Sequence, residues 1–386
     1  MERRLALIYI VGAMSTLAVS LWQPLLPLYL DIKGLLPWEV GLGVSMMMNM
    51  AFITAFIAGY VVDKLGWERS LIISQIIIAS TTLSLVIVNN ILVLIVISIG
   101  FGLAIALLNQ SSVKVVALST EIKERGTAFS SYLIATGFSR ITGSSLSGYV
   151  ATMLGYGSLF FISSILTLPA ILLLKYNAIN LESKKKVSFN RALNLISKDL
   201  RLKLLAFTLF IHDFSVFILI PYLALFAKYS IGLGEKEVGL LSGISNLATM
   251  FSFFLSGWIA DKIGGTYTLI LHFISTSLSY IFYSTASDFL SAATAYAMIG
   301  VAVSFDMPAR RLLLTKYAPK EYIGAISGFA DTLAGIGTMF SPLVGGHLWA
   351  ISYSAPLIVG SLFNLIAVPL AFSLKVIKRR RTKEKL

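Results

Sequence analysis

The sequence predicts an all-α membrane protein with twelve transmembrane helices, arranged as two six-helix bundles related by an internal duplication. Of the 386 residues, 57% are hydrophobic and 13% are charged, and the mean hydropathy is +0.85. A chain of this length and composition has too little polar surface to be water-soluble. Twelve apolar runs are each long enough to cross about 30 Å of hydrocarbon. The second half also repeats the first at a fixed offset of 198 residues.

The apolar runs are expected to be helices rather than the strands of a barrel. They are uninterrupted, whereas barrel strands alternate in polarity over segments of about ten residues. The expected spans are 5–30, 40–62, 70–88, 91–117, 126–150 and 156–175 in the first half, and 203–227, 238–260, 267–286, 289–315, 324–349 and 354–375 in the second. The corresponding domains are an N-terminal bundle (1–175), a basic linker (176–202), a C-terminal bundle (203–375) and a basic tail (376–386).

The first span follows a short basic stretch that could open a signal peptide. Its apolar run is too long for one and lacks a small-residue cleavage site, so we expect it to be retained as a helix. The span ends at Gln23, Pro24 and Pro27. Proline removes helix hydrogen bonds, and such breaks occur in membranes where the backbone lines a cavity or packs against protein. A kinked structural helix and a gating role both remain open.

The distribution of basic residues predicts the orientation in the membrane. Of the 31 lysines and arginines, the loops after odd-numbered spans hold only Lys33, Lys228 and Lys236. Cytoplasmic loops carry the excess of basic residues, so both termini are expected in the cytoplasm. This topology explains the net charge of +13, and we expect no nucleic-acid partner. The chain has no cysteine, which excludes disulfides and thiolate metal sites.

One eight-residue stretch occurs in both halves, at the end of the second span and at the end of the eighth. The shared residues are Gly59, Asp63, Lys64 and Gly66 in the first half, and Gly257, Asp261, Lys262 and Gly264 in the second. The first glycine permits close approach of another helix. An acidic residue at a helix–loop junction can face the positive N-terminus of another helix or a basic side chain. A polar turn alone would not require these residues twice, so we interpret the stretch as a contact that opens and closes.

The repeated Gly-x-x-x-Asp-Lys-x-Gly pattern, the twelve spans and the duplication resemble the major facilitator superfamily of secondary transporters, most of all its drug/proton antiporter branches. The resemblance covers essentially the whole chain. It implies two six-helix bundles around a central cavity, which exchange access by rocking, and it assigns the repeated stretch to a cytoplasmic gate. In the family, basic residues usually follow the second glycine directly, whereas Trp67 and Glu68 precede Arg69 here. We therefore expect a gate with fewer charges.

Two further patterns bear on the type of transport. Many drug antiporters of the family carry an arginine four residues before the first glycine of the fourth span, where this chain has Val96. Residues 341–346 (Ser-Pro-Leu-Val-Gly-Gly) keep the proline and both final glycines of an antiporter motif, whereas residues 143–148 have serine in place of the proline and of one glycine. Only one half of the chain therefore supports antiport.

Three ionisable residues are expected near the middle of the bilayer. Arg140 lies about 14 residues into the fifth span, and His212 and Asp213 lie about 14–15 Å along the seventh, at about 1.5 Å per residue. A charge at this depth is costly, so such residues usually face a cavity and have a partner. An Asp in a cavity whose hydration changes can bind and release a proton. Alternatively, Asp213 forms a permanent ion pair, for which Arg140 is the candidate partner.

The family resemblance implies a cavity lined mainly by spans 1, 4, 7 and 10. Polar residues on these spans, together with Arg140, are candidates for substrate binding or proton coupling: Gln23, Asn109, His212, Asp213 and Asp306. Asp306 and Arg310 are four residues apart on one helix face, which predicts an ion pair. Arg310 and Asp331 are also candidates for the cytoplasmic gate. His272 and His347 lie nearer helix ends and are expected to be structural.

The linker and the tail are expected to contact lipid. The linker contains three lysines at 184–186. After them, Ser188 is a candidate helix cap. The residues that follow it place an apolar face on one side of a helix: Phe189, Ala192, Leu193, Ile196 and Leu200. This pattern suggests a helix on the inner membrane surface, although a plain linker fits nearly as well. The basic run at 378–381 in the tail favours contact with anionic lipid head groups.

The sequence predicts a transporter rather than an enzyme, because it contains no nucleophile–base pair, metal-ligand cluster or phosphate loop. The first hypothesis is a proton-coupled exporter of small lipophilic compounds in the cytoplasmic membrane, monomeric, without a cofactor and driven by the proton gradient. The second is a symporter or uniporter for a metabolite such as a sugar or organic anion, bound by Arg140. The third is a receptor or scaffold that transports nothing, which the duplicated gate stretch disfavours.

Overall fold

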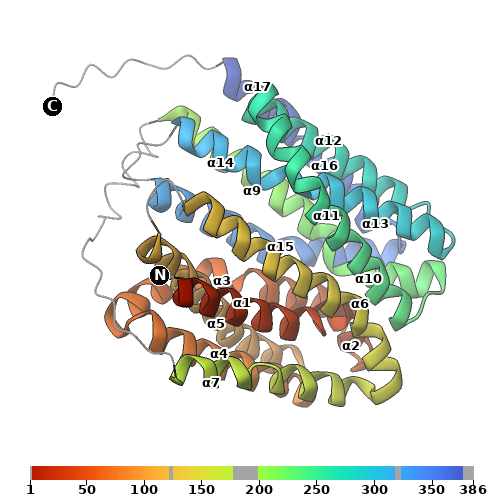
Figure 1. Cartoon of the computed structure of the whole chain (residues 1–386). Helices are drawn as coiled ribbons and strands as arrows, with labels where there is room; N and C mark the ends of the chain where they lie inside the picture. Colours follow the sequence, from red (N-terminus) through yellow and green to blue (C-terminus); the bar gives the residue numbers. More distant parts are fainter. Residues whose placement is uncertain (1, 121–124, 177–198, 318–322, 377–386) are drawn as a thin grey trace, which may run out of the picture.

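The computed structural model describes residues 2–120, 125–176, 199–317 and 323–376. Within these ranges every regular element is a helix. Figure 1 shows the first half (α1 to α7) and the second half (α9 to α17) side by side, with α6 and α15 where the halves meet. The predicted surface helix of the linker, apart from Leu200, and the basic run of the tail lie outside the described residues.

The helices of the first half follow the predicted spans. Their bounds are α1 Glu2–Ser20, η1 Gln23–Leu25, α2 Leu26–Ile32, α3 Pro37–Leu65, α4 Trp67–Ser84, η2 Leu85–Ile87, α5 Ile91–Ser119, α6 Arg125–Ile165 and α7 Leu168–Tyr176. As expected, the prolines interrupt the first span, because α1 gives way to the 3-10 turn η1 and the short helix α2. Helix α6 contains parts of two predicted spans, since Gly155 has φ of 78° and breaks the helical path inside it.

The second half repeats this plan. Its bounds are α9 Leu200–Leu219, η3 Ile220–Tyr222, α10 Leu223–Phe226, η4 Ala227–Ile231, α11 Glu235–Ile263, α12 Gly265–Tyr283, α13 Phe289–Ser304, α14 Asp306–Tyr317, α15 Ile323–Ile351, α16 Ala355–Asn364 and α17 Ala367–Val376. Three predicted spans are broken near prolines: Pro221 between α9 and α10, Pro308 at the start of α14 and Pro369 at the start of α17. Each proline removes one helical hydrogen bond and crowds the preceding turn.

Eight segments of the described chain are long and apolar enough to cross a membrane, and a ninth is α3, which bends by 57°. One of the eight runs from Ala128 to Lys175 and therefore covers two predicted spans that meet at Gly155. Helices α12 and α15 are not among them; α12 carries many serines and threonines. The fold is consistent with the twelve predicted spans.

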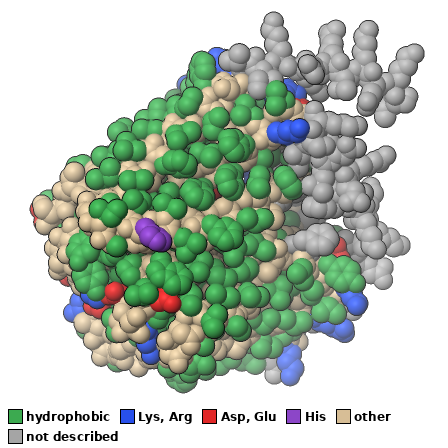
Figure 2. Space-filling model, turned by 180° about the vertical axis from the view of Figure 1, so that it is seen from behind, with side chains coloured by type: hydrophobic (Ala, Val, Ile, Leu, Met, Phe, Trp, Pro, Cys, Tyr) green, Lys and Arg blue, Asp and Glu red, His purple; other side chains and the backbone are tan. Residues whose placement is uncertain are grey.

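The outer surface is largely apolar. Figure 2 shows a broad face covered by hydrophobic side chains, with charged side chains gathered toward its edges. Large apolar side chains such as Ile87, Phe254 and Leu290 are 68%, 83% and 76% exposed. An apolar exterior of this extent suits contact with lipid rather than with water.

The two halves bind each other at the end of the bundle opposite the repeated stretches, which we call the closed end. There the Lys228 ammonium lies 2.9 Å from the Asp31 carboxylate, and the Tyr229 hydroxyl donates to the same carboxylate at 2.7 Å. The buried Tyr222 hydroxyl lies between two carbonyl oxygens, 2.9 Å from that of Pro342 in its own half and 3.1 Å from that of Pro37. Asp31 and Pro37 belong to the first half, so these contacts join the two halves.

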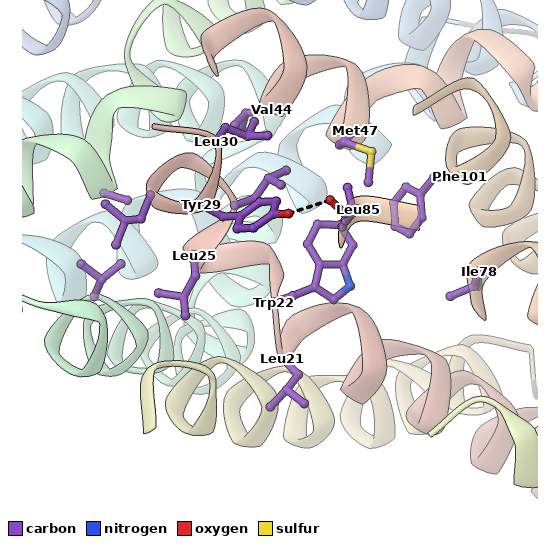
Figure 3. Close-up of a cluster of buried hydrophobic side chains, with 14 of the residues drawn as sticks. Leu21, Trp22, Leu25, Tyr29, Leu30, Val44, Met47, Ile78, Leu85 and Phe101 are labelled. Carbon is purple, nitrogen blue, oxygen red and sulfur yellow. Dashed lines mark hydrogen bonds between the residues drawn. The ribbon is translucent and has the colours of Figure 1, made fainter. Parts of the chain in front are cut away.

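Beneath the closed end, large buried side chains of the first half form a tight cluster (Figure 3). Trp22, Leu25 and Tyr29 come from the interrupted end of the first span. The Tyr29 hydroxyl donates to the carbonyl oxygen of Leu85 at 2.8 Å, and the Trp22 ring packs edge-on against Phe101 at 5.5 Å between centroids. The proline-broken segment is therefore firmly packed against its own half in this conformation.

Glycines mark the points where helices of opposite halves cross. A Cβ atom added to Gly148 of α6 would lie 2.0 Å from the carbonyl oxygen of Glu235, at the start of α11. One added to Gly346 of α15 would lie 2.6 Å from Cα of Trp38, at the start of α3. Gly148 and Gly346 are equivalent positions of the two repeats. The internal duplication thus places two matching helix crossings at the closed end.

The contacts between the halves extend only part of the way toward the end that carries the repeated stretches, which we call the motif end. Among the described glycines that touch the other half, Gly137 and Gly335 lie furthest from the closed end; their added Cβ atoms would meet Met250 at 3.4 Å and Phe52 at 3.3 Å. At Gly59, near the motif end, an added Cβ atom would meet nothing within 4 Å. The described glycine contacts between the halves therefore lie toward the closed end.

Replacing Gly148 by leucine should prevent the closed end from forming, because the new side chain would collide with backbone atoms, which cannot rotate away. A cysteine in place of Ser147, which is completely buried at this crossing, should then react faster with a maleimide that cannot cross the membrane. Gly157→Leu is the matched control, since an added Cβ atom there meets nothing within 4 Å. Equal reaction rates in the Gly148→Leu variant and its parent would contradict this account of the crossing.

Candidate functional site

A cluster of charged side chains lies inside the second half. The Arg310 guanidinium donates to Asp213 from Nη1 to Oδ2 at 3.1 Å and from Nη2 to Oδ1 at 2.6 Å, and its Nε donates to Oδ1 of Asp306 at 2.5 Å. The side chains of Arg310, Asp213 and Asp306 are only 14%, 18% and 21% exposed. The planar fork of one arginine therefore holds two carboxylates at once.

A break in the tenth span positions two of these side chains. Pro308 cannot donate to the carbonyl four residues earlier, so α13 ends at Ser304 and α14 begins at Asp306. Asp306 lies in the first turn of α14, where the helix dipole favours a negative charge, and Arg310 follows one turn later on the same face. The ion pair predicted from their four-residue spacing is present in the structure.

Two buried histidines lie beside the carboxylates. His212 of α9 and His272 of α12 are 4% and 2% exposed, and their Nε2 atoms are 3.0 Å apart. His212 Nε2 lies 3.9 Å from Oδ1 of Asp213, and His272 Nε2 lies 3.8 Å from Oδ1 of Asp306. We expected His272 to be structural and near a helix end, but it joins His212 in a cluster that connects α9, α12 and α14.

The other ring nitrogen of each histidine is held by a hydrogen-bond acceptor. His272 Nδ1 lies 2.8 Å from the carbonyl oxygen of Ala302, in the last turn of α13, where helical carbonyls lack their usual partners. His212 Nδ1 lies 2.7 Å from Oδ1 of Asn364, the last residue of α16. The Asn364 amide nitrogen donates to the carbonyl oxygen of Phe273 at 3.1 Å. Asn364 thus ties the cluster to the break in the twelfth span, a role that the sequence analysis missed.

Two expectations about arginines are corrected by this geometry. Arg140 was the candidate partner of Asp213, but the partner is Arg310. Arg310 was also a candidate for the cytoplasmic gate, whereas it lies in the buried cluster. Spacing along one helix predicts a pair within α14, but it contains no information about which side chain of another helix lies opposite Asp213.

Arg140 lies on the inward face of α6. It falls between Gly137, which contacts Met250 of α11, and Ser144, whose hydroxyl accepts a hydrogen bond from Asn246 of α11 at 2.9 Å. Residues three or four apart share a helix face, so Arg140 points the same way, yet its side chain is exposed. An exposed side chain on an inward face indicates a space between the halves that solvent can reach.

The remaining predicted cavity residues lie outside the charge cluster. Gln23 is half-buried in η1, which packs against α6 and α11 close to the closed end. Asn109 is exposed in the second half of α5. In the described structure the predicted set therefore separates into a charge cluster in the second half and single polar groups in the first half.

In the first half, the repeated stretch forms an ion pair within its own bundle. The Lys114 ammonium of α5 lies 2.9 Å from the Asp63 carboxylate and donates to the carbonyl oxygen of Val62 at 3.2 Å. The Asp63 side chain is 66% exposed, and an ion pair so open to solvent contributes little stability. The sequence analysis did not assign Lys114 to this site, because 51 residues separate it from Asp63.

The glycines of the repeated stretches serve two different purposes. Gly66 and Gly264 end their helices with φ of +86° and +84°, a conformation that other residues rarely adopt. Gly59 and Gly257 lie in regular helix, and an added Cβ atom would meet nothing within 4 Å. Local geometry therefore explains the second glycine of each stretch, while this conformation gives no reason for the first.

The other gate candidates line the motif end without burying their charges. Lys64, Arg69, Asp261 and Lys262 are all exposed. The Lys262 ammonium lies 3.8 Å from the ring centroid of Trp258, one turn earlier in α11. Asp331 belongs to α15, but its side chain lies outside the described part of the structure.

Two repeated helical halves, joined at one end and with a buried charge cluster in the second half, are the architecture of many secondary transporters. The sequence model of the Major Facilitator Superfamily matches this chain twice, over residues 8–204 and 205–386. The protein therefore belongs to the Major Facilitator Superfamily, whose members are membrane transporters rather than enzymes.

Several bacterial relatives match along nearly the whole chain. Multidrug resistance protein 2 of Bacillus subtilis is 23% identical over 368 residues, which cover 92% of this chain and 90% of the relative. The multi-drug resistance efflux pump PmrA of Streptococcus pneumoniae is 24% identical over 370 residues, covering 90% and 92%. Multidrug resistance protein 1 of Bacillus subtilis is 25% identical over 377 residues, covering 93% of each chain.

Replacing Arg310 by glutamine should destabilise the protein strongly, because two largely buried carboxylates would lose their shared partner. Removing one member of a buried ion pair costs about 3–5 kcal/mol of the free energy of unfolding. Thermal unfolding of the purified protein in detergent, followed by tryptophan fluorescence, measures the effect. Arg69→Gln is the control, since Arg69 is exposed. An unchanged melting temperature for Arg310→Gln would show that the arginine does not neutralise the carboxylates.

Proposed function

We propose that this protein exports small, largely apolar organic compounds across the cytoplasmic membrane and that proton entry drives the export. The observation that carries this proposal is the similarity, over 90% or more of the chain, to relatives named multidrug resistance proteins and an efflux pump. The similarity includes both halves, so it concerns the complete transport unit rather than one bundle.

In the proposed orientation, both termini and the motif end face the cytoplasm. The excess of basic residues in the corresponding loops supports this orientation. In this proposal the described conformation, joined by Asp31 and Lys228 at the closed end, is open at the motif end and receives substrate from the cytoplasm. Export requires a second conformation with the motif end closed. Gly59 and Gly257 support its existence, since a glycine in a regular helix is needed where another segment packs closely.

The buried charge cluster supports proton coupling. Asp213 and Asp306 both depend on Arg310 in the described conformation. A carboxylate that lost Arg310 while staying out of water would bind a proton, because an isolated buried charge is costly. Movement of α14 relative to α9 would separate Asp213 from Arg310. Proton uptake and the change of conformation are thereby linked in this proposal.

The space between the halves is the proposed path of the substrate. Arg140 and Asn109 are exposed, and Arg140 faces α11 across the boundary between the halves. Gln23 lies at its closed end. We further propose a monomer with two bundles, residues 1–175 and 203–375, whose basic linker and tail contact anionic lipid head groups.

A second candidate function, symport of an organic anion, is favoured by Arg140. An exposed guanidinium on an inward face could bind a carboxylate or a phosphate by two parallel hydrogen bonds. Symport and export predict opposite directions of substrate movement for the same pH gradient. Transport measured in both directions therefore separates the two functions.

Transport of ethidium by the purified protein in proteoliposomes should follow an imposed pH gradient and run opposite to proton movement. Asp213→Asn should abolish this gradient-driven transport while leaving ethidium exchange without a gradient, because the variant keeps the shape of the site but loses a charge that changes during the cycle. Asp288→Asn is the control, since Asp288 caps α13 at the surface. Ethidium moving in the same direction as protons, or not at all, would contradict proton-driven export.

A further inference from the structure

The hydrogen bonds of the two buried histidines determine where their protons lie. His272 Nδ1 faces the carbonyl oxygen of Ala302 at 2.8 Å. A carbonyl oxygen accepts hydrogen bonds and cannot donate them, so His272 carries a proton on Nδ1. The Thr276 hydroxyl lies farther from the same nitrogen, at 3.3 Å. If His272 is neutral, its Nε2 atom has no proton.

The same reasoning applies to His212, whose Nδ1 atom lies 2.7 Å from Oδ1 of Asn364. The orientation of that amide is fixed by its other contacts. Its nitrogen donates to the carbonyl oxygen of Phe273 at 3.1 Å, and reversing the amide would place two acceptors against each other. Ser277 accepts from the same nitrogen at 3.0 Å. His212 therefore also carries its proton on Nδ1.

Two neutral histidines with these tautomers would leave two unprotonated nitrogens facing each other. The Nε2 atoms are 3.0 Å apart, which is the distance of a normal hydrogen bond. Neither Asp213 nor Asp306 can replace the missing donor, since both carboxylates accept hydrogen bonds from Arg310. The contact is satisfied only if one histidine is doubly protonated and donates to the other.

We infer that His212 and His272 together bind one proton more than two neutral imidazoles, held between their Nε2 atoms, and that this buried pair is a proton-binding site of the second half. The ligand of the site is the proton itself. The role of this site in coupling rests on the proposed function, whereas the binding of the proton does not.

The charges around the histidine pair agree with one extra proton on it. The charged side chains that lie beside the pair in the described structure are Asp213 of α9 and Asp306 and Arg310 of α14. Helices α13 and α16 contribute uncharged groups, the Ala302 carbonyl and the Asn364 amide. Two carboxylates and one guanidinium leave one negative charge, which the extra proton neutralises. A neutral cluster is the least costly arrangement inside a membrane.

Loss of the proton would break the contact between the histidines. The proton would move from Nε2 to a carboxylate oxygen, either Oδ1 of Asp306 or Oδ1 of Asp213, at 3.8 or 3.9 Å. The carboxylate becomes a neutral acid, and the imidazolium becomes a neutral imidazole. Two bare Nε2 atoms then repel each other, so α9 and α12 separate or one ring changes its partners. Proton release is thereby tied to the relative position of two helices.

The test is solid-state NMR on the full-length protein in lipid bilayers, with ¹⁵N-labelled histidine. The chain has only three histidines, so His212→Gln, His272→Gln and His347→Gln assign every signal. At pH 7.5 an ordinary histidine is mostly neutral, because its unperturbed pKa is about 6.5. We expect the ¹⁵N signals of one doubly protonated and one neutral ring for His212 and His272. We also expect a coupling between their Nε2 atoms across the N–H···N bond. Two neutral rings at His212 and His272 would overturn the inference.

The role in coupling is tested separately by transport. His212→Gln and His272→Gln should each lose most of the ethidium transport driven by a pH gradient, while His347→Gln keeps it, because His347 bonds only to the Leu343 carbonyl of its own helix in the described structure. An intact NMR signature with unchanged transport in both variants would refute coupling through the pair. Absence of ethidium transport in the parent protein, with the NMR signature present, would refute the proposed function and leave the proton site standing.

Discussion

The fork of Arg310 is the interaction on which the second half depends. It holds Asp213 of α9 and Asp306 of α14 at once, and both carboxylates lie beside the buried histidines. Such a cluster is tolerated in a membrane only while its charges balance and its hydrogen bonds are satisfied. Any movement that separates α14 from α9 therefore leaves a charge without a partner, and a proton is the simplest ligand that restores the balance.

The internal duplication supplies the movement. Equivalent glycines, Gly148 and Gly346, place matching helix crossings at the closed end, and the equivalent pair Gly59 and Gly257, near the motif end, touches no other segment in this conformation. Because the two halves are related by sequence, a contact that a helix of the first half makes, such as that at Gly148, has an equivalent made by the corresponding helix of the second half, such as that at Gly346. Rocking of one half against the other can then exchange one set of contacts for another without unfolding either bundle.

The fold was predictable because hydropathy and repetition are properties of the chain alone. The proline breaks and the pair of Asp306 with Arg310 were predictable for the same reason, since each depends on neighbours within one helix. The partner of Asp213 was not, because it comes from another helix almost a hundred residues away. The contact of His272 with His212 was not predictable either, because depth along a helix does not reveal which side chain lies opposite. The role of Asn364 was not predictable, since a single amide in an apolar span can bond to many different partners.

The central claim is that the protonation state of the charge cluster decides which end of the bundle is open. Distances between spin labels at Tyr60 and Trp258 test it directly. Both residues are exposed near the motif end, one in each half, and the cysteine-free chain allows labels at these two sites alone. The account predicts long distances in the parent protein, in which Asp213 is paired with Arg310, and a shift to shorter distances in the Asp213→Asn variant, which mimics the protonated carboxylate. The same distance distribution in the parent protein and in the variant would contradict it.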